Sequence, residues 1–96
     1  MDLASRISNH RAAIHALVDR HHAANPRLFG SVAHGRTTTS SDIDILVDAL
    51  PEATLFDLGG LQDALEDLLG APVDLVTPGD IVASLRATII EDARPL

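Results

Sequence analysis

The stretch that decides the fold is residues 27–48, RLFGSVAHGRTTTSSDIDILVD. It begins with a short run at 27–29, predicted to be a strand, which leads into Gly30-Ser31. A hydroxyl-rich loop at 37–41 then precedes a second run at 43–48.

The second run alternates in a way that is typical of a strand with two different faces. Ile43, Ile45 and Val47 fall on one face, and Asp44 and Leu46 fall on the other. Asp42 lies two residues before Asp44 and therefore shares its face, because side chains of a strand repeat every second residue. The strand is expected to bury its first face and to present carboxylates on its second.

Apolar periodicity on both sides of this stretch predicts the other elements. A helix is expected from Leu3 to about Ala24, ended by Asn25-Pro26. The others are a helix at 55–69 before Gly70, a strand at 73–76, and a last helix from Ile81, with Asp80 as its N-cap, that ends before Pro95. This order predicts one α/β domain over residues 1–96, a small mixed β-sheet covered by helices.

Composition excludes several kinds of chemistry. The chain has 96 residues, a net charge of −7, seven basic residues that are all arginine, and no cysteine. A lysine nucleophile, a thiolate zinc site and a phosphate-binding loop with its lysine are therefore impossible. Tight nucleic-acid binding is not expected from an acidic chain, and the apolar runs are too short to span a membrane, so a cytoplasmic protein is expected.

Three aspartates in two short predicted strands require an explanation. Asp42 and Asp44 begin one strand, and Asp74 lies in the apolar run at 73–76. Carboxylates so placed either face water or hold a cation, and hard oxygen ligands in this number suit Mg²⁺. Gly30 allows the backbone to approach a phosphate closely, and the N–H groups that follow Ser31 can point at an anion.

The motifs LFGSVAHG at 28–35 and SDIDILV at 41–47, with the later Asp74, resemble the polymerase-β-type nucleotidyltransferase superfamily. They are most similar to its minimal branch, the bacterial antitoxins encoded beside HEPN-domain toxins. The motifs span residues 28–76, and the element order resembles that branch over nearly the whole chain. One departure is His34, where such antitoxins often carry arginine.

The resemblance implies an activity and a set of site residues. It implies that Asp42 and Asp44 ligate two Mg²⁺ ions and that Asp74 completes the metal site and helps to activate the attacking hydroxyl. It implies that Gly30, Ser31 and Arg36 hold the phosphates of ATP. The expected function is that of an antitoxin that transfers AMP from ATP to a HEPN toxin.

Other interpretations remain open at the level of the sequence. Asp42 and Asp44 are also compatible with a solvated strand face, Asp74 with a solvent-facing residue, and Ser31 with a helix N-cap. A phosphoaspartyl hydrolase is disfavoured because its first aspartate follows a long apolar strand, whereas Asp42 follows hydroxyl residues. The main alternative is a non-catalytic antitoxin that neutralises its partner by binding alone.

Overall fold

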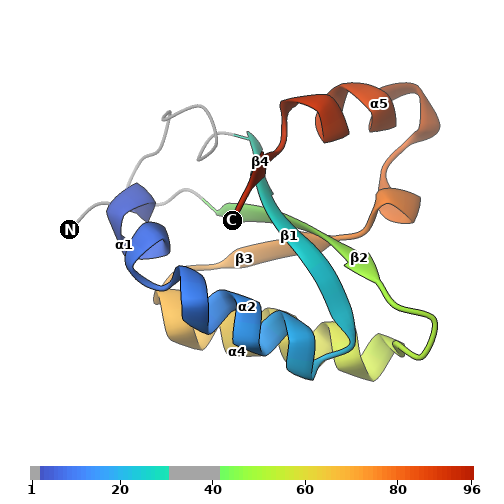
Figure 1. The fold of residues 1–96 in the computed structure, drawn as a ribbon. Coiled ribbons are helices and arrows are strands. Elements are labelled where there is room, and N and C mark those ends of the chain that lie inside the picture. Colours follow the sequence, from blue (N-terminus) through green and yellow to red (C-terminus); the bar gives the residue numbers. More distant parts are fainter. Residues whose placement is uncertain (1–2, 31–41) are drawn as a thin grey trace.

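The computed structural model describes residues 3–30 and 42–96 (Figure 1). The described helices are α1 (Leu3–Asn9), α2 (Arg11–Arg20), α4 (Leu55–Leu69), the 3-10 helix η1 (Pro78–Asp80) and α5 (Ala83–Asp92). The described strands are β1 (Ala23–Phe29), β2 (Ile43–Ala49), β3 (Val73–Val76) and β4 (Arg94–Pro95). No helix within these residues is long and apolar enough to cross a bilayer.

The four strands form one mixed sheet in the order β3-β2-β1-β4. β1 pairs antiparallel with both β2 and β4, and β2 pairs parallel with β3. Figure 1 shows α2 and α4 together on one side of the strands and α5 on the other. The expected small mixed sheet covered by helices is confirmed.

The main core lies between the sheet and the pair α2 and α4. Ile43, Ile45 and Val47 of β2 are fully buried there, and they pack with the stripe of leucines at 61, 65 and 69 of α4. These α4 residues recur every four positions, which places them on one face of the helix. Leu46 is also fully buried, but it lies outside this core cluster, on the other face of β2.

Helix α4 has the predicted bounds, and local residues fix both of its ends. Thr54 and Asp57 form a capping box, in which the Thr54 Oγ1 accepts from the Asp57 N–H at 3.1 Å and an Asp57 carboxylate oxygen accepts from the Thr54 N–H at 2.9 Å. Gly70 ends the helix with a φ of 66°, a left-handed conformation that glycine adopts without a steric penalty.

The prediction of one helix from Leu3 to about Ala24 is wrong. The chain forms two helices, α1 and α2, separated at His10, and helical structure ends at Arg20. Residues from Ala23 onward belong to β1, because their backbone groups pair with β2 over Ala23–Phe29. Tertiary pairing with a strand twenty residues away overrides the local helical pattern here.

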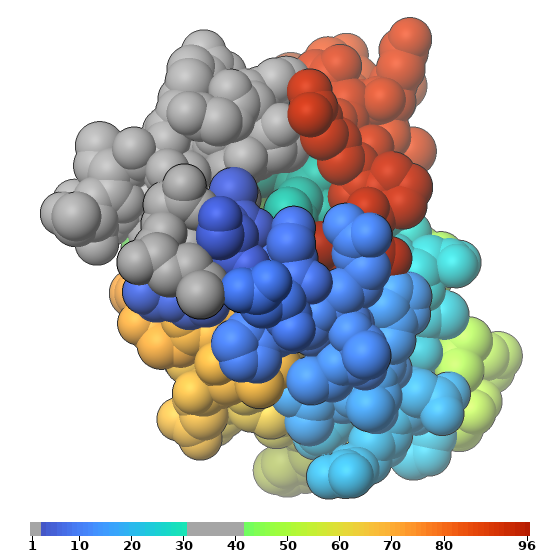
Figure 2. Space-filling view, turned by 60° about the vertical axis from the view of Figure 1, so that its left-hand side comes forward, coloured from blue at the N-terminus to red at the C-terminus, as the bar shows by residue number. Residues whose placement is uncertain are grey.

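The last predicted helix is shorter than expected and has another start. Asp80 does not cap this helix. Its carboxylate accepts from the Thr77 N–H at 3.0 Å and so caps the beginning of η1. Helix α5 begins at Ala83 instead. The short strand β4 was not predicted; Leu96 follows it, donates its N–H to the Pro26 carbonyl, and lies close to His15 of α2. Figure 2 shows this red C-terminal segment against the blue surface of α2.

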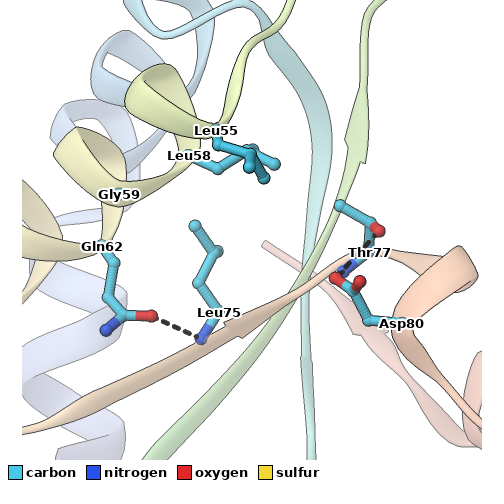
Figure 3. Close-up of a pocket in the computed structure, with 7 residues that line it drawn as sticks. All are labelled: Leu55, Leu58, Gly59, Gln62, Leu75, Thr77 and Asp80. Carbon is cyan, nitrogen blue, oxygen red and sulfur yellow. Dashed lines mark hydrogen bonds between the residues drawn. The ribbon is translucent and has the colours of Figure 1, made fainter.

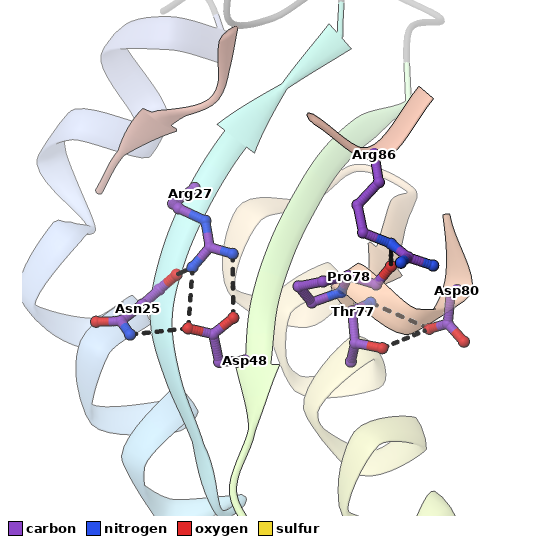
Figure 4. A network of polar contacts seen from close by, with 7 residues as sticks. All are labelled: Asn25, Arg27, Asp48, Thr77, Pro78, Asp80 and Arg86. Atoms are coloured by element: carbon purple, nitrogen blue, oxygen red, sulfur yellow. Dashed lines mark hydrogen bonds and ion pairs between the residues drawn. The ribbon is translucent and has the colours of Figure 1, made fainter. Parts of the chain in front are cut away.

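A bulge in β1 is held by a polar cluster (Figure 4). Asn25 has a φ of 53°, and the pairing register shifts between Ala24 and Arg27. Asn25 Nδ2 donates to the Asp48 carboxylate at 2.9 Å, and the Arg27 guanidinium donates to the same group at 3.2 Å. These hydrogen bonds, from Arg27 first and Asn25 second, lower the pKa of Asp48.

We expect Asp48→Asn to destabilise the chain by about 1 kcal/mol, which corresponds to ~4–8 °C in a domain of this size. The stabilisation by Asp48 is present above its ordinary pKa of 3.8 and is lost as the pH falls through the lowered folded value. Thermal unfolding at pH 7 and at pH 3 measures both effects. Asp67→Asn, on the exposed surface of α4, is the control, and equal midpoints for the two variants would contradict the prediction.

Candidate functional site

The sheet brings the predicted aspartates to one end of two neighbouring strands. Asp44 of β2 lies directly opposite Asp74 of β3 in the parallel register, so the two residues share a face of the sheet on strands that lie about 5 Å apart. Asp42 immediately precedes β2 and lies on the same side as Asp44. Asp42 and Asp74 are exposed, whereas Asp44 is half-buried.

Gly30 lies at the same end of the sheet, directly after β1. Its neighbour Phe29 pairs with Asp44, and Gly30 has a φ of 71°, which few other residues adopt. A Cβ atom at this position would collide with the Asp44 carboxylate. The sequence indicated a glycine that lets the backbone approach a phosphate, and the structure adds that only glycine leaves room for Asp44.

The three carboxylates interact electrostatically. Burial raises the pKa of Asp44 above its ordinary value, and the negative charges of Asp74 and Asp42 raise it further. A half-buried carboxylate beside two others favours either a proton or a cation at this position. This is the charge distribution that a cation-binding site requires before the cation arrives.

The donor set fits Mg²⁺, which prefers a few carboxylate oxygens and completes its shell with water and phosphate. Among residues 3–30 and 42–96, no three acidic, histidine or cysteine side chains already stand in a ligating arrangement. Asp42 and Asp74 are exposed, so their side chains have room to turn toward Asp44. These three residues could hold a cation only after their side chains turned toward one another.

Two of the predicted phosphate-binding residues, Ser31 and Arg36, lie outside the described residues. The same holds for His34 and for the hydroxyl-rich segment at 37–41. Of the six predicted site residues, the structure therefore places four, Gly30, Asp42, Asp44 and Asp74, and gathers them at one end of the sheet.

A mixed sheet that gathers carboxylates beside a glycine turn fits the class of nucleotidyltransferases. A family model described as the nucleotidyltransferase domain matches residues 11–96. The chain belongs to this family.

Relatives of known sequence agree with the family. A "putative protein adenylyltransferase" of Methanocaldococcus jannaschii is 36% identical over 74 residues, which cover 77% of this chain and 80% of the relative. The protein adenylyltransferase MntA of Thermococcus cleftensis is 35% identical over 65 residues, 68% of this chain. The match covers 66% of that relative.

Solved structures show the same fold. A "putative minimal nucleotidyltransferase" superposes with a TM-score of 0.90 at 41% identity, covering 100% of this chain and 97% of that one. The toxin–antitoxin pair MntA-HpeT gives a TM-score of 0.71 at 27% identity, covering 90% of this chain and 70% of that one. A toxin–antitoxin structure with AMP-PNP shares the fold at 23% identity and a TM-score of 0.70, covering 96% of this chain and 70% of that one.

We expect Asp44→Asn to raise the thermal midpoint by a few degrees at pH 7 in the presence of EDTA. Since the folded pKa of Asp44 is raised, its contribution to stability is fully present below 3.8 and is lost as the pH rises through the folded value. The asparagine variant lacks this loss, so the difference from wild type should vanish near pH 3. Asp63→Asn on the exposed side of α4 is the control. A lower midpoint for Asp44→Asn at pH 7 would contradict the prediction.

Proposed function

We propose that this chain is a Mg²⁺-dependent adenylyltransferase that acts as an antitoxin by transferring AMP from ATP to a partner HEPN-domain toxin. The observation that carries the proposal is the placement of Asp42, Asp44 and Asp74 around one end of β2 and β3, with the Gly30 backbone against Asp44. Membership of the nucleotidyltransferase family supports the type of reaction.

In the proposed reaction all three carboxylates bind metal, and Asp74 also acts on the acceptor hydroxyl. Asp42 and Asp44 would hold two Mg²⁺ ions, and Asp74 would complete the metal site. When bound, Mg²⁺ supplies positive charge that stabilises the attacking and leaving oxygens at the α-phosphorus. The acceptor hydroxyl forms the new oxygen–phosphorus bond while the bond to pyrophosphate breaks, and Asp74 helps to take up the hydroxyl proton.

We assign the phosphates of ATP to Gly30, directly after β1, and to residues that follow it in the sequence. The Gly30 backbone lies beside the Asp44 carboxylate, so a phosphate bound there would share its cation with that carboxylate. Ser31 and Arg36 are proposed to donate further hydrogen bonds to the phosphates. The chain has no lysine, so arginine, backbone N–H groups and metal must compensate the phosphate charge.

A protein acceptor fits the composition of the chain. It contains no tyrosine, so it is not its own tyrosine substrate, and its net charge of −7 disfavours an RNA acceptor. Relatives at 35% and 36% identity carry the name protein adenylyltransferase, and a structure at 27% identity is a toxin–antitoxin pair. These names support a toxin as the acceptor.

A non-catalytic antitoxin is the second candidate, since a nucleotidyltransferase fold can also neutralise a partner by covering it. The carboxylate cluster argues against this alternative. Three carboxylates share one end of the sheet, with Asp44 half-buried among them, and binding of a partner alone does not require such a cluster.

We expect Asp42→Ala to lower the rate of Mg²⁺-dependent AMP transfer to the toxin at least ~10²-fold, because it removes a metal ligand. Intact-mass spectrometry of the toxin after incubation with ATP and Mg²⁺ measures the added AMP, and Asp67→Ala serves as the control. An unmodified toxin that wild type and Asp42→Ala inhibit equally, at stoichiometric amounts, would replace the enzymatic function by the binding one.

We expect Asp74→Asn to lower the rate of transfer more than the affinity for ATP, because its proposed role concerns the acceptor hydroxyl and not the phosphates. Calorimetry with a non-hydrolysable ATP analogue gives the affinity, and single-turnover kinetics give the rate. If both quantities fell by the same factor, Asp74 would act in holding the nucleotide.

A further inference from the structure

The outer edge of the sheet is closed to another strand. β3 is an edge strand, and its outward N–H groups already donate to side chains of the same chain: Val73 to Glu66 at 2.9 Å, Leu75 to Gln62 at 3.4 Å and Thr77 to Asp80 at 3.0 Å. An edge strand recruits a partner strand through such groups when they are unpaired. The outward N–H groups of this edge are therefore not free to pair with a strand of a partner protein.

An exposed apolar surface lies beside β3, at the beginning of α4. Leu55 and Phe56 are 87% and 92% exposed, which is unusual for large apolar side chains placed next to each other. Between α4, β3 and η1 lies a pocket of about 250 Å³. Figure 3 shows Leu55 and Leu58 reaching from α4 toward Leu75, with Thr77 and Asp80 across the opening. We call this pocket and the exposed Phe56 beside it the α4–η1 surface.

Gly59 lines the pocket and has no steric role in the described structure. A Cβ atom at Gly59 would meet no described atom within 4 Å, whereas a Cβ atom at the neighbouring Gly60 would touch the His21 ring at 3.4 Å. Glycine inside a helix is destabilising relative to alanine. Gly59 therefore leaves open space at the pocket wall, whereas a side chain at Gly60 would make an ordinary contact with His21.

The charge around the pocket indicates what kind of partner binds. Helix α4 has no basic residue; of its four carboxylates, Asp63 and Asp67 are exposed, whereas Asp57 and Glu66 already bind groups of the same chain. Asp80 adds a carboxylate at the opening. A second copy of this acidic chain would bring like charges together, whereas an apolar side chain ringed by arginine or lysine would meet complementary charge.

We propose that the α4–η1 surface is the docking site of the partner toxin, and that an apolar side chain of the toxin, surrounded by basic residues, enters the pocket against Gly59. This inference rests on the proposed function for the identity of the partner. Asp74 and Leu75 are consecutive in β3 and point to opposite faces, so docking and chemistry use opposite sides of the same strand. The two functions are therefore separable by mutation.

The test is the affinity of the purified toxin for Gly59→Leu, measured by calorimetry without ATP. Leucine fills the pocket and is a better helix former than glycine, so the thermal midpoint should hold or rise while the affinity falls at least tenfold. Gly60→Ala is the matched control on the α2 side of the same helix and should bind the toxin like wild type. AMP transfer by Gly59→Leu should recover at saturating toxin, which would place the defect in KM.

A second variant keeps the test decisive if Gly59→Leu folds poorly. Leu55→Arg changes a residue that is 87% exposed and places a positive charge where a basic partner surface would sit, so it should also weaken binding at least tenfold. Wild-type affinity in both variants would overturn the docking site. The wild type could instead self-associate through this surface. If Gly59→Leu abolished self-association and left toxin binding unchanged, the surface would be assigned to a second copy and the docking site would also be overturned.

The outcomes also separate this inference from the proposed function. A toxin that binds through the α4–η1 surface but never gains AMP would support the docking site and remove the enzymatic function. If Gly59→Leu and Leu55→Arg transfer AMP to the toxin with unchanged KM, the enzymatic function would be supported and the docking site would be removed. A toxin that does not bind the wild type at all would overturn both.

Discussion

The alternation of side chains along β2 is the constraint on which the rest of the structure depends. Ile43, Ile45 and Val47 are fully buried against α2 and α4, and this burial fixes the register of the strand. A slip by one residue would place Asp44 in the apolar core, where an unpaired carboxylate is strongly disfavoured. The same packing that stabilises the fold therefore holds Asp44 on the opposite face.

The candidate site introduces a local instability that the main core compensates. Asp44 is half-buried beside two other carboxylates, and its raised pKa shows that its charged form is disfavoured there. Strain of this kind persists where the surrounding structure determines the geometry, and here the sheet pairing of β2 with β1 and β3 does so. Gly30 contributes by leaving the space that the Asp44 carboxylate occupies.

The sheet also separates two kinds of surface. At its β3 edge, side chains from α4 and η1 accept hydrogen bonds from the outward N–H groups, so these N–H groups are already paired within the chain. The apolar side chains beside this edge remain exposed, notably Leu55 and Phe56. We propose that the end of the strands with Asp44 and Asp74 carries the chemistry, and we infer separately that the beginning of α4 binds the partner.

The sequence by itself determined the elements whose signals are local. The bounds of α4 and β3 and the alternation of β2 followed from leucine periodicity, the glycine after α4 and a period of two, all of which act within a few residues. The sequence predicted a strand only at 27–29; the tertiary structure decided that it begins at Ala23 and that β4 pairs beside it, because those backbone groups find their partners far along the chain. It also decided the parallel register of β2 and β3, which places Asp74 opposite Asp44 across thirty residues of sequence. Spacing alone does not fix that distance, since it depends on how α4, which connects the two strands, packs on the face of the sheet.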